Sequence, residues 1–200
     1  MDVASVYQIK SPMEKERQAQ VAPLLSLHKE LKEELQNLMY YAEEEELYKR
    51  ENKKGGWSFL EIFLHVNLLN DFYLCQFPAS LAKATRPQAR GTWVGGQLLK
   101  ATQKPRGQKS LLPSRAPAAV DPLKKQEKGH ALVADVIFRE LITDLDSLGQ
   151  HLAQFPTYAY EELRIQSLAP LVKLNGWDAL QLIPYHLQRH LAQARALQQA

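Results

Sequence analysis

Apolar residues recur along the chain at the spacing of one helical face, and the alternation typical of β-strands is almost absent. The first of four such segments begins at Ser11-Pro12-Met13-Glu14. Serine suits the N-cap, proline suits the first helical position, and Glu14 completes a capping box. The inward stripe of this predicted helix is Leu24, His28, Leu31, Leu35, Leu38 and Ala42. Gly55-Gly56 then breaks the chain.

The second predicted helix begins directly after this break. Ser58 and Glu61 have the spacing of a capping box, and Trp57 is positioned to pack on Ile62 as a hydrophobic staple. The helix is expected to run to about Lys83 or Arg86, before Pro87. Its inward stripe is Ile62, His65, Leu69 and Phe72.

Two further helices are predicted in the second half of the chain. The third begins at Asp121-Pro122, an N-cap followed by proline, and ends before Pro156. The fourth begins near Asn175 and runs almost to the C-terminus, where Pro184 is expected to kink its first turns. The third stripe is Val133, Ile137, Leu141, Leu145, Leu148 and Leu152, and the fourth is Ala179, Ile183, His186, His190, Ala194 and Leu197.

Four amphipathic helices of this length predict an all-α fold, a four-helix bundle, in a single domain spanning residues 1–200. The first connection is short, so the first two helices are expected to be antiparallel. The connection over residues 85–120 is long enough to cross the whole bundle, so the third helix is expected to run parallel to the second. Within it, Trp93-Val94 and Gln97-Leu98-Leu99 predict a short helix that docks on the bundle.

The composition is that of an ordinary globular protein. The chain has 200 residues, of which 45% are hydrophobic and 24% charged, which excludes disordered, collagen-like and disulfide-scaffold classes. The most apolar stretch, residues 62–82, contains His65, Asn67, Asn70 and Asp71, which argues against a membrane span. No secretory signal is visible and Cys75 is the one cysteine, so we expect a cytoplasmic protein.

Basic residues are concentrated in the crossover over residues 85–120, which has no acidic residue. Such a loop could contact an anionic substrate, a membrane surface or nucleic acid. The net charge of the chain is only +3, and Trp93 is the one aromatic residue of the loop, so base stacking is poorly supported. We interpret the loop as a solvated crossover and expect no nucleic-acid partner.

Three histidines fall on the apolar stripes. His186 and His190 are one turn apart on the fourth predicted helix, and His65 lies on the second. An i,i+4 pair of imidazoles can bind one metal ion, but a surface pair or hydrogen-bonded core histidines are the alternatives. Three inward histidines in one small bundle favour the metal site, because bundles build such sites from facing side chains.

Other candidates for chemistry are weaker. Glu140 and Asp144 flank the third stripe and are interpreted as a solvated face, so no general base is obvious. We interpret His28 as a core or rim histidine and His130 and His151 as surface residues. We interpret Cys75 as an unreactive residue packed in the interior.

Two segments resemble the DinB/YfiT-like superfamily. Trp57-Ser58, His65, Asn67 and Asn70-Asp71-Phe72-Tyr73-Leu74 are similar to its helix-two signature, and residues 185–194 (YHLQRHLAQA) are similar to its helix-four signature. The helix order and the long second connection extend the resemblance to the whole chain.

The resemblance implies an up-down-down-up bundle with a divalent metal, nickel or zinc, on His65, His186 and His190. Family members include thiol-dependent S-transferases and isomerases that use low-molecular-weight thiols, and several form dimers. It therefore implies a metal-dependent S-transferase or hydrolase with a small-molecule substrate, and a homodimer is one expectation. The alternative is a non-catalytic metal-binding or structural bundle, which the lack of an obvious general base favours.

The sequence departs from the family pattern at two positions. Close relatives often have an acidic residue just before the first histidine, where this chain has Leu64. Pro184 stands two residues before His186, where the family pattern has no proline. The first departure removes a carboxylate next to the first ligand, and the second bears on how His186 approaches the metal.

Overall fold

The computed structural model describes residues 10–41, 47, 56–78, 90–103, 116–169 and 171–198. The described chain is mostly helical, as the periodicity predicts. Its long helices are α1 (Pro12–Tyr41), α3 (Phe59–Leu74), α6 (Ala134–Gln154) and α7 (Gly176–Gln198). The connections contain α4 (Trp93–Gln103), α5 (Pro122–Gln126), the 3-10 turns η1 (Ala118–Val120) and η2 (Tyr160–Glu162), and the strands β1 (Arg164–Gln166) and β2 (Lys173–Asn175).

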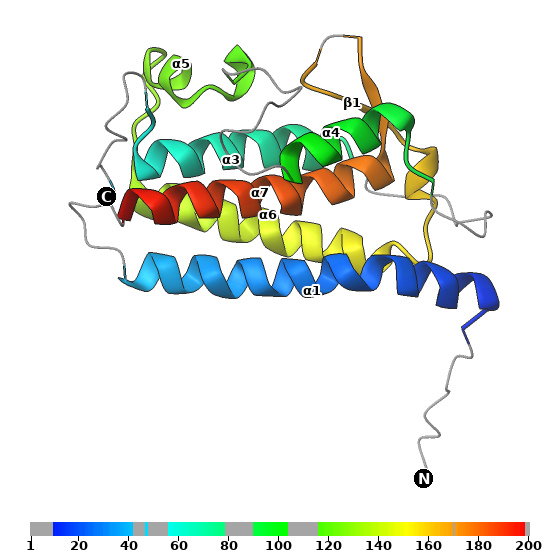
Figure 1. The fold of residues 1–200 in the computed structure, drawn as a ribbon. Coiled ribbons are helices and arrows are strands. Elements are labelled where there is room, and N and C mark those ends of the chain that lie inside the picture. Colours follow the sequence, from blue (N-terminus) through cyan, green and yellow to red (C-terminus); the bar gives the residue numbers. More distant parts are fainter. Residues whose placement is uncertain are drawn as a thin grey trace.

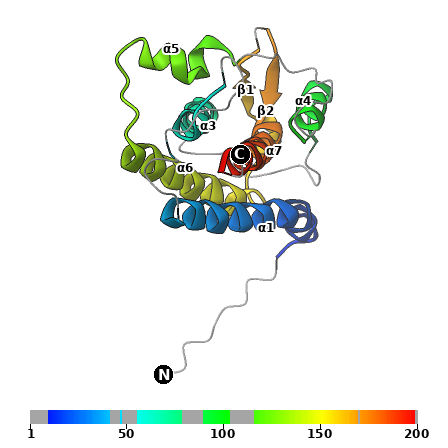
Figure 2. The same ribbon diagram turned by 60° about the vertical axis from the view of Figure 1, so that its left-hand side comes forward.

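The long helices lie in two layers, α1 beside α6 and α3 beside α7 (Figure 2). Both α6 and α7 pack against α1 and against α3, so the four helices enclose a common core. Figure 1 shows α3 and α6 running in one direction, and α1 and α7 in the opposite direction. The shorter α4 packs along α7, and α5 packs on α3.

Most of the described residues of the predicted stripes lie in the core, while Ala42 of the first stripe lies outside the described residues. Leu35 of α1 and Leu141 and Leu145 of α6 have no exposed surface. Burial of one such side chain contributes about 1.5–3 kcal/mol, so these stripes hold the two layers together. Val133 departs from its predicted place in the core, because it is 46% exposed and precedes α6.

The predicted starts of α1 and α3 are confirmed by their capping boxes. The Ser11 hydroxyl accepts a hydrogen bond from the Glu14 amide, and the Glu14 carboxylate accepts one from the Ser11 amide. Ser58 and Glu61 form the same reciprocal pair at the start of α3. Both caps pair backbone N–H groups that a helix start otherwise leaves without partners.

The predicted end of α3 near Lys83 or Arg86 is wrong, because the helix ends at Leu74. The Gln76 side chain accepts a hydrogen bond from the Gln166 amide at 2.7 Å, which fastens the chain to β1. Pro78 follows, and the residue before a proline disfavours the helical conformation. Residues 79–89, which contain the predicted helix end, lie outside the described residues.

The predicted start of the third long helix is also wrong. Asp121 and Pro122 do begin a helix, and the Asp121 carboxylate accepts a hydrogen bond from the Leu123 amide at 3.0 Å. That helix is the short α5, and the chain turns at Gly129, whose φ of 89° suits glycine. The long helix α6 begins only at Ala134, while the predicted start of α7 near Asn175 is confirmed.

The connections contain a short helix that the sequence predicted and a pair of strands that it did not. The predicted short helix in the crossover is α4, with Leu98 against the core and Trp93 79% exposed. The sequence predicted no strands, but β1 and β2 pair antiparallel with the buried residues Ile165 and Leu174 opposite each other. In the part of the chain that the structure describes, no helix has the length and apolar character needed to cross a membrane.

Candidate metal centre

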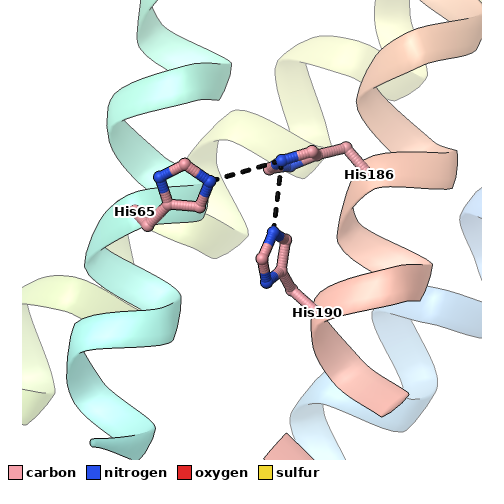
Figure 3. A group of neighbouring side chains, drawn as sticks. All are labelled: His65, His186 and His190. Carbon is pink, nitrogen blue, oxygen red and sulfur yellow. Dashed lines mark hydrogen bonds between the residues drawn. The ribbon is translucent and has the colours of Figure 1, made fainter. Parts of the chain in front are cut away.

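The three predicted histidines meet inside the bundle. Figure 3 shows His65 projecting from α3, and His186 and His190 from α7, toward one another. The Nε2 atom of His186 lies 3.3 Å from Nε2 of His65 and 3.2 Å from Nε2 of His190. Among the described residues, these three side chains form a cluster in which one nitrogen of each ring lies within 4.8 Å of the others.

The helices explain how the rings converge. His186 and His190 are one turn apart on α7, so their side chains stack on one face of that helix. That face packs against α3, where His65 lies one turn after the capping residue Glu61. The three residues are 5%, 8% and 7% exposed for His65, His186 and His190, so the cluster is almost fully enclosed.

Outer hydrogen bonds orient two of the rings. Nδ1 of His65 lies 2.6 Å from the carbonyl oxygen of Val120. Nδ1 of His190 lies 3.1 Å from Oε1 of Gln193. Both oxygens accept hydrogen bonds, so each Nδ1 donates a ring proton and each ring turns Nε2 toward the cluster, where the neutral form of the ring has a lone pair.

His186 lies between these two lone pairs and cannot satisfy both. A neutral imidazole has one N–H group, so Nε2 of His186 donates to one neighbour at most. Its other nitrogen, Nδ1, is buried and has no hydrogen-bond partner among the described residues. Whichever nitrogen carries the proton, the cluster therefore presents at least one buried lone pair that needs a cation or a donor.

The site disfavours a proton as that cation. Burial lowers the pKa of His186 well below its usual range, and His190, His65 and Arg189 lower it further. Burial also lowers the pKa of His65, against the opposing effects of the Val120 carbonyl and Asp121. Both rings are therefore neutral at neutral pH, which is the form in which imidazole binds a metal.

The spacing and chemistry of the nitrogens fit a divalent transition metal. Two ligands each about 2.0–2.1 Å from one tetrahedral ion lie roughly 3.3 Å apart. The two Nε2 separations of 3.3 and 3.2 Å match this value. Imidazole donors suit zinc, nickel, copper and iron, whereas calcium and magnesium prefer oxygen ligands.

Trp57 contacts the cluster instead of serving only as a staple. Its ring centroid lies 4.8 Å from that of His65 and 6.5 Å from that of His190. The indole therefore forms one wall beside two of the three histidines. The position of Trp57 before the N-cap predicts packing on Ile62 as a hydrophobic staple and gives no indication of the histidines.

The other predicted histidines lie outside the cluster. Nε2 of His28 lies 2.7 Å from the Leu145 carbonyl oxygen, which confirms a rim position. His130 is exposed, as predicted. The surface prediction for His151 is wrong, since the ring is half-buried with Nδ1 2.8 Å from the hydroxyl of Tyr160, and burial lowers its pKa.

Two further predictions need correction. Glu140 lies on the solvated face as expected, but Asp144 is half-buried. Burial, together with the nearby Asp71 and Glu140, raises the pKa of Asp144 to about 7. Cys75 was expected to be packed inside, yet it is exposed at the end of α3, where the chain leaves the helix.

The sequence pattern did not predict the groups that orient the His65 ring. The Val120 carbonyl belongs to the backbone, and no side-chain pattern indicates where it lies. Gln126 donates a hydrogen bond to the buried Glu61 carboxylate at 2.9 Å and joins α5 to α3. The sequence predicts Glu61 only as part of a capping box, and its burial, which requires a further hydrogen-bond partner, is seen only in the structure.

One comparison with known proteins places the chain in a family. The family model described as the DinB superfamily matches residues 24–194, which include all three histidines. No curated protein and no solved structure matches the chain. Because the family match covers most of the sequence, from the fourth turn of α1 to the last turns of α7, the chain belongs to the DinB superfamily.

Proposed function

We propose that this chain is a metal-dependent enzyme on an up-down-down-up bundle, in which His65, His186 and His190 hold one divalent transition metal, nickel or zinc. One observation carries the proposal. Three imidazoles direct nitrogens at one enclosed point, and the outer Nδ1 atoms of His65 and His190 already have acceptors. Open catalytic sites with three protein ligands have this donor pattern.

The described cluster contains three histidines and no carboxylate. A divalent metal on three imidazoles leaves coordination positions open and lowers the pKa of a water or thiol bound there. A thiol gives up its proton far more easily than water, so it depends less on a protein base. We therefore favour a thiol-dependent S-transferase that uses a low-molecular-weight thiol over a hydrolase.

The chain's own residues prepare the site in three ways. Burial keeps His65 and His186 neutral and restricts the entry of bulk water. The acceptors Val120 and Gln193 fix the orientation of two rings. Trp57 supplies an apolar wall against which the carbon skeleton of a small substrate can pack.

A second candidate is a non-catalytic metal-binding bundle. The observation that favours it is the same lack of a carboxylate within the described cluster, because most hydrolytic metal sites pair the metal with a general base. Conjugation of a small thiol to electrophilic substrates separates the two candidates. Turnover that requires the metal and disappears in His65→Ala supports the enzyme, whereas metal binding without turnover over a broad panel supports the binding module.

The metal proposal is tested on untagged protein that is stripped and reloaded with nickel or zinc. We expect one ion per chain in the wild type. Replacement of any one ligand leaves two and is expected to weaken binding by orders of magnitude. The ligand variants are His65→Ala, His186→Ala and His190→Ala, and the matched controls are His28→Ala, His130→Ala and His151→Ala. A wild type that holds no metal, or a His65→Ala variant that holds as much as wild type, overturns the proposal.

A further inference from the structure

The segment that supplies the acceptor for His65 is Ala118–Gln126, which combines η1 and α5 and is called the strap below. The strap packs on α3, and Figure 1 shows α5 alongside that helix. Val120 is 1% exposed and Pro122 is buried, so apolar contacts seat the strap. Its Val120 carbonyl oxygen lies 2.6 Å from Nδ1 of His65.

This contact determines which nitrogen of His65 can bind a metal. A carbonyl oxygen accepts hydrogen bonds and donates none, so it selects the tautomer with the proton on Nδ1. In that tautomer Nε2 has a lone pair, and Nε2 is the atom that faces His186. A strap that moved away would free His65 to place its proton on Nε2, the nitrogen that the metal needs.

The far end of the strap is fastened to the same helix. Nε2 of Gln126 donates to Oε1 of Glu61 at 2.9 Å, and Oε2 of Glu61 accepts from the Ser58 amide at 2.7 Å. Glu61 has no exposed surface, so its carboxylate depends on such partners. One buried carboxylate thus joins the start of α3 to the end of the strap, one helical turn before His65.

The geometry points to Gln126 as a positioning residue of the metal centre. By holding the strap against Glu61, Gln126 keeps the Val120 carbonyl on His65 and presents a bare Nε2 to the cluster. This inference rests on the proposed role of the histidines as metal ligands. Outer partners of ligand histidines typically change metal affinity by about 10–100-fold when they are lost.

The test compares Gln126→Met with Lys124→Met. Methionine nearly matches glutamine in length but cannot donate to Glu61, and Lys124 is an exposed residue of the same short helix. Nitrogen-15 NMR of the metal-free protein at neutral pH reads the tautomer of His65. We expect the Nδ1–H form in the wild type and in Lys124→Met, and a mixture of tautomers in Gln126→Met. Affinity for zinc is expected to fall about 10-fold in Gln126→Met only.

The outcomes are separable from those of the metal proposal. A wild-type His65 with its proton on Nε2 overturns the inference, and so does an unchanged tautomer in Gln126→Met, whatever happens to affinity. If Gln126→Met does not fold, Gln126→Asn shortens the side chain beyond reach of Glu61 and takes its place. A wild type that binds no zinc, while the His65 tautomer still responds to Gln126→Met, overturns the metal proposal and supports the strap.

Discussion

Gly95 of α4 sets how closely that helix approaches α7. A β-carbon at this position would lie well inside van der Waals contact of the Asp178 carboxyl group. Asp178 cannot easily yield, because its carboxylate accepts hydrogen bonds from the Thr92 amide at 3.0 Å, the Thr92 hydroxyl at 2.7 Å and the Asn175 amide at 3.2 Å. Gly95→Ala must therefore displace α4 or break part of this network.

The expected cost follows from the opposing effects. Overpacking costs about 1–3 kcal/mol, and loss of one hydrogen bond to the charged carboxylate costs about 1.5–3 kcal/mol. The higher helix propensity of alanine offsets about 1 kcal/mol of this loss in stability. We expect Gly95→Ala to lower the free energy of unfolding by about 1–2 kcal/mol. At the neighbouring Gly96, no described atom beyond the adjacent residues and the nearby backbone of the same helix lies within 4 Å of such a carbon, so Gly96→Ala should raise stability by about 0.5–1 kcal/mol.

Urea unfolding followed by circular dichroism measures both variants against the wild type. The prediction is a difference in sign between adjacent glycines of one helix, which propensity alone cannot produce. In an Asp178→Ala background the carboxylate is gone, so the penalty of Gly95→Ala should disappear. A Gly95→Ala protein as stable as Gly96→Ala, or a penalty that persists without Asp178, would refute this account of the α4–α7 contact.

Two further predictions concern buried charge. Because burial, Asp71 and Glu140 raise the pKa of Asp144 to about 7, the native state keeps a proton that the unfolded chain releases from pH about 4 upward, and stability falls over this window. Asp144→Asn should therefore raise the free energy of unfolding by about 1 kcal/mol at pH 8, after allowance for solvent screening, and leave it nearly unchanged at pH 4. Urea unfolding at the two pH values measures this difference, and an equal increase at both contradicts the raised pKa of Asp144. Arg17 has no exposed surface and donates to the Phe155 and Tyr158 carbonyls and the Glu161 carboxylate. Arg17→Met should lower the free energy of unfolding by about 3–5 kcal/mol, and by less in a Glu161→Gln background. If the effects of the two substitutions simply add, Arg17 and Glu161 are not coupled.

Periodicity and cap signals predicted the long helices because both arise from local physics. The apolar stripe of α6 and the capping boxes of α1 and α3 depend on residues within one or two turns. The start of α6 was misplaced for a related reason, since Asp121-Pro122 is a sound N-cap signal but belongs to α5. The strands β1 and β2 were missed because each is only three residues long, too short for alternation to be recognised.

The candidate site was predictable as far as side chains define it. His65, His186 and His190 lie on apolar stripes, and helical geometry alone brings the last two together. The partners of the rings were out of reach, because the Val120 carbonyl carries no sequence signature. The half-buried positions of Asp144 and His151 depend on contacts between segments, such as the hydrogen bond between His151 and Tyr160, that no local pattern encodes.

The crossover is more than a solvated link between two helices. Its first described part is tied to α7 through Thr92 and Asp178, and the strap, which includes its last three residues, is tied to α3 through Gln126 and Glu61. Those two helices carry the three histidines, and both carboxylates lie in the first turn of their helix. The same buried charges that fix the helix starts therefore anchor the crossover. Since site geometry depends on the rigidity of the elements that carry it, a change at either anchor is expected to reach the histidines without touching them.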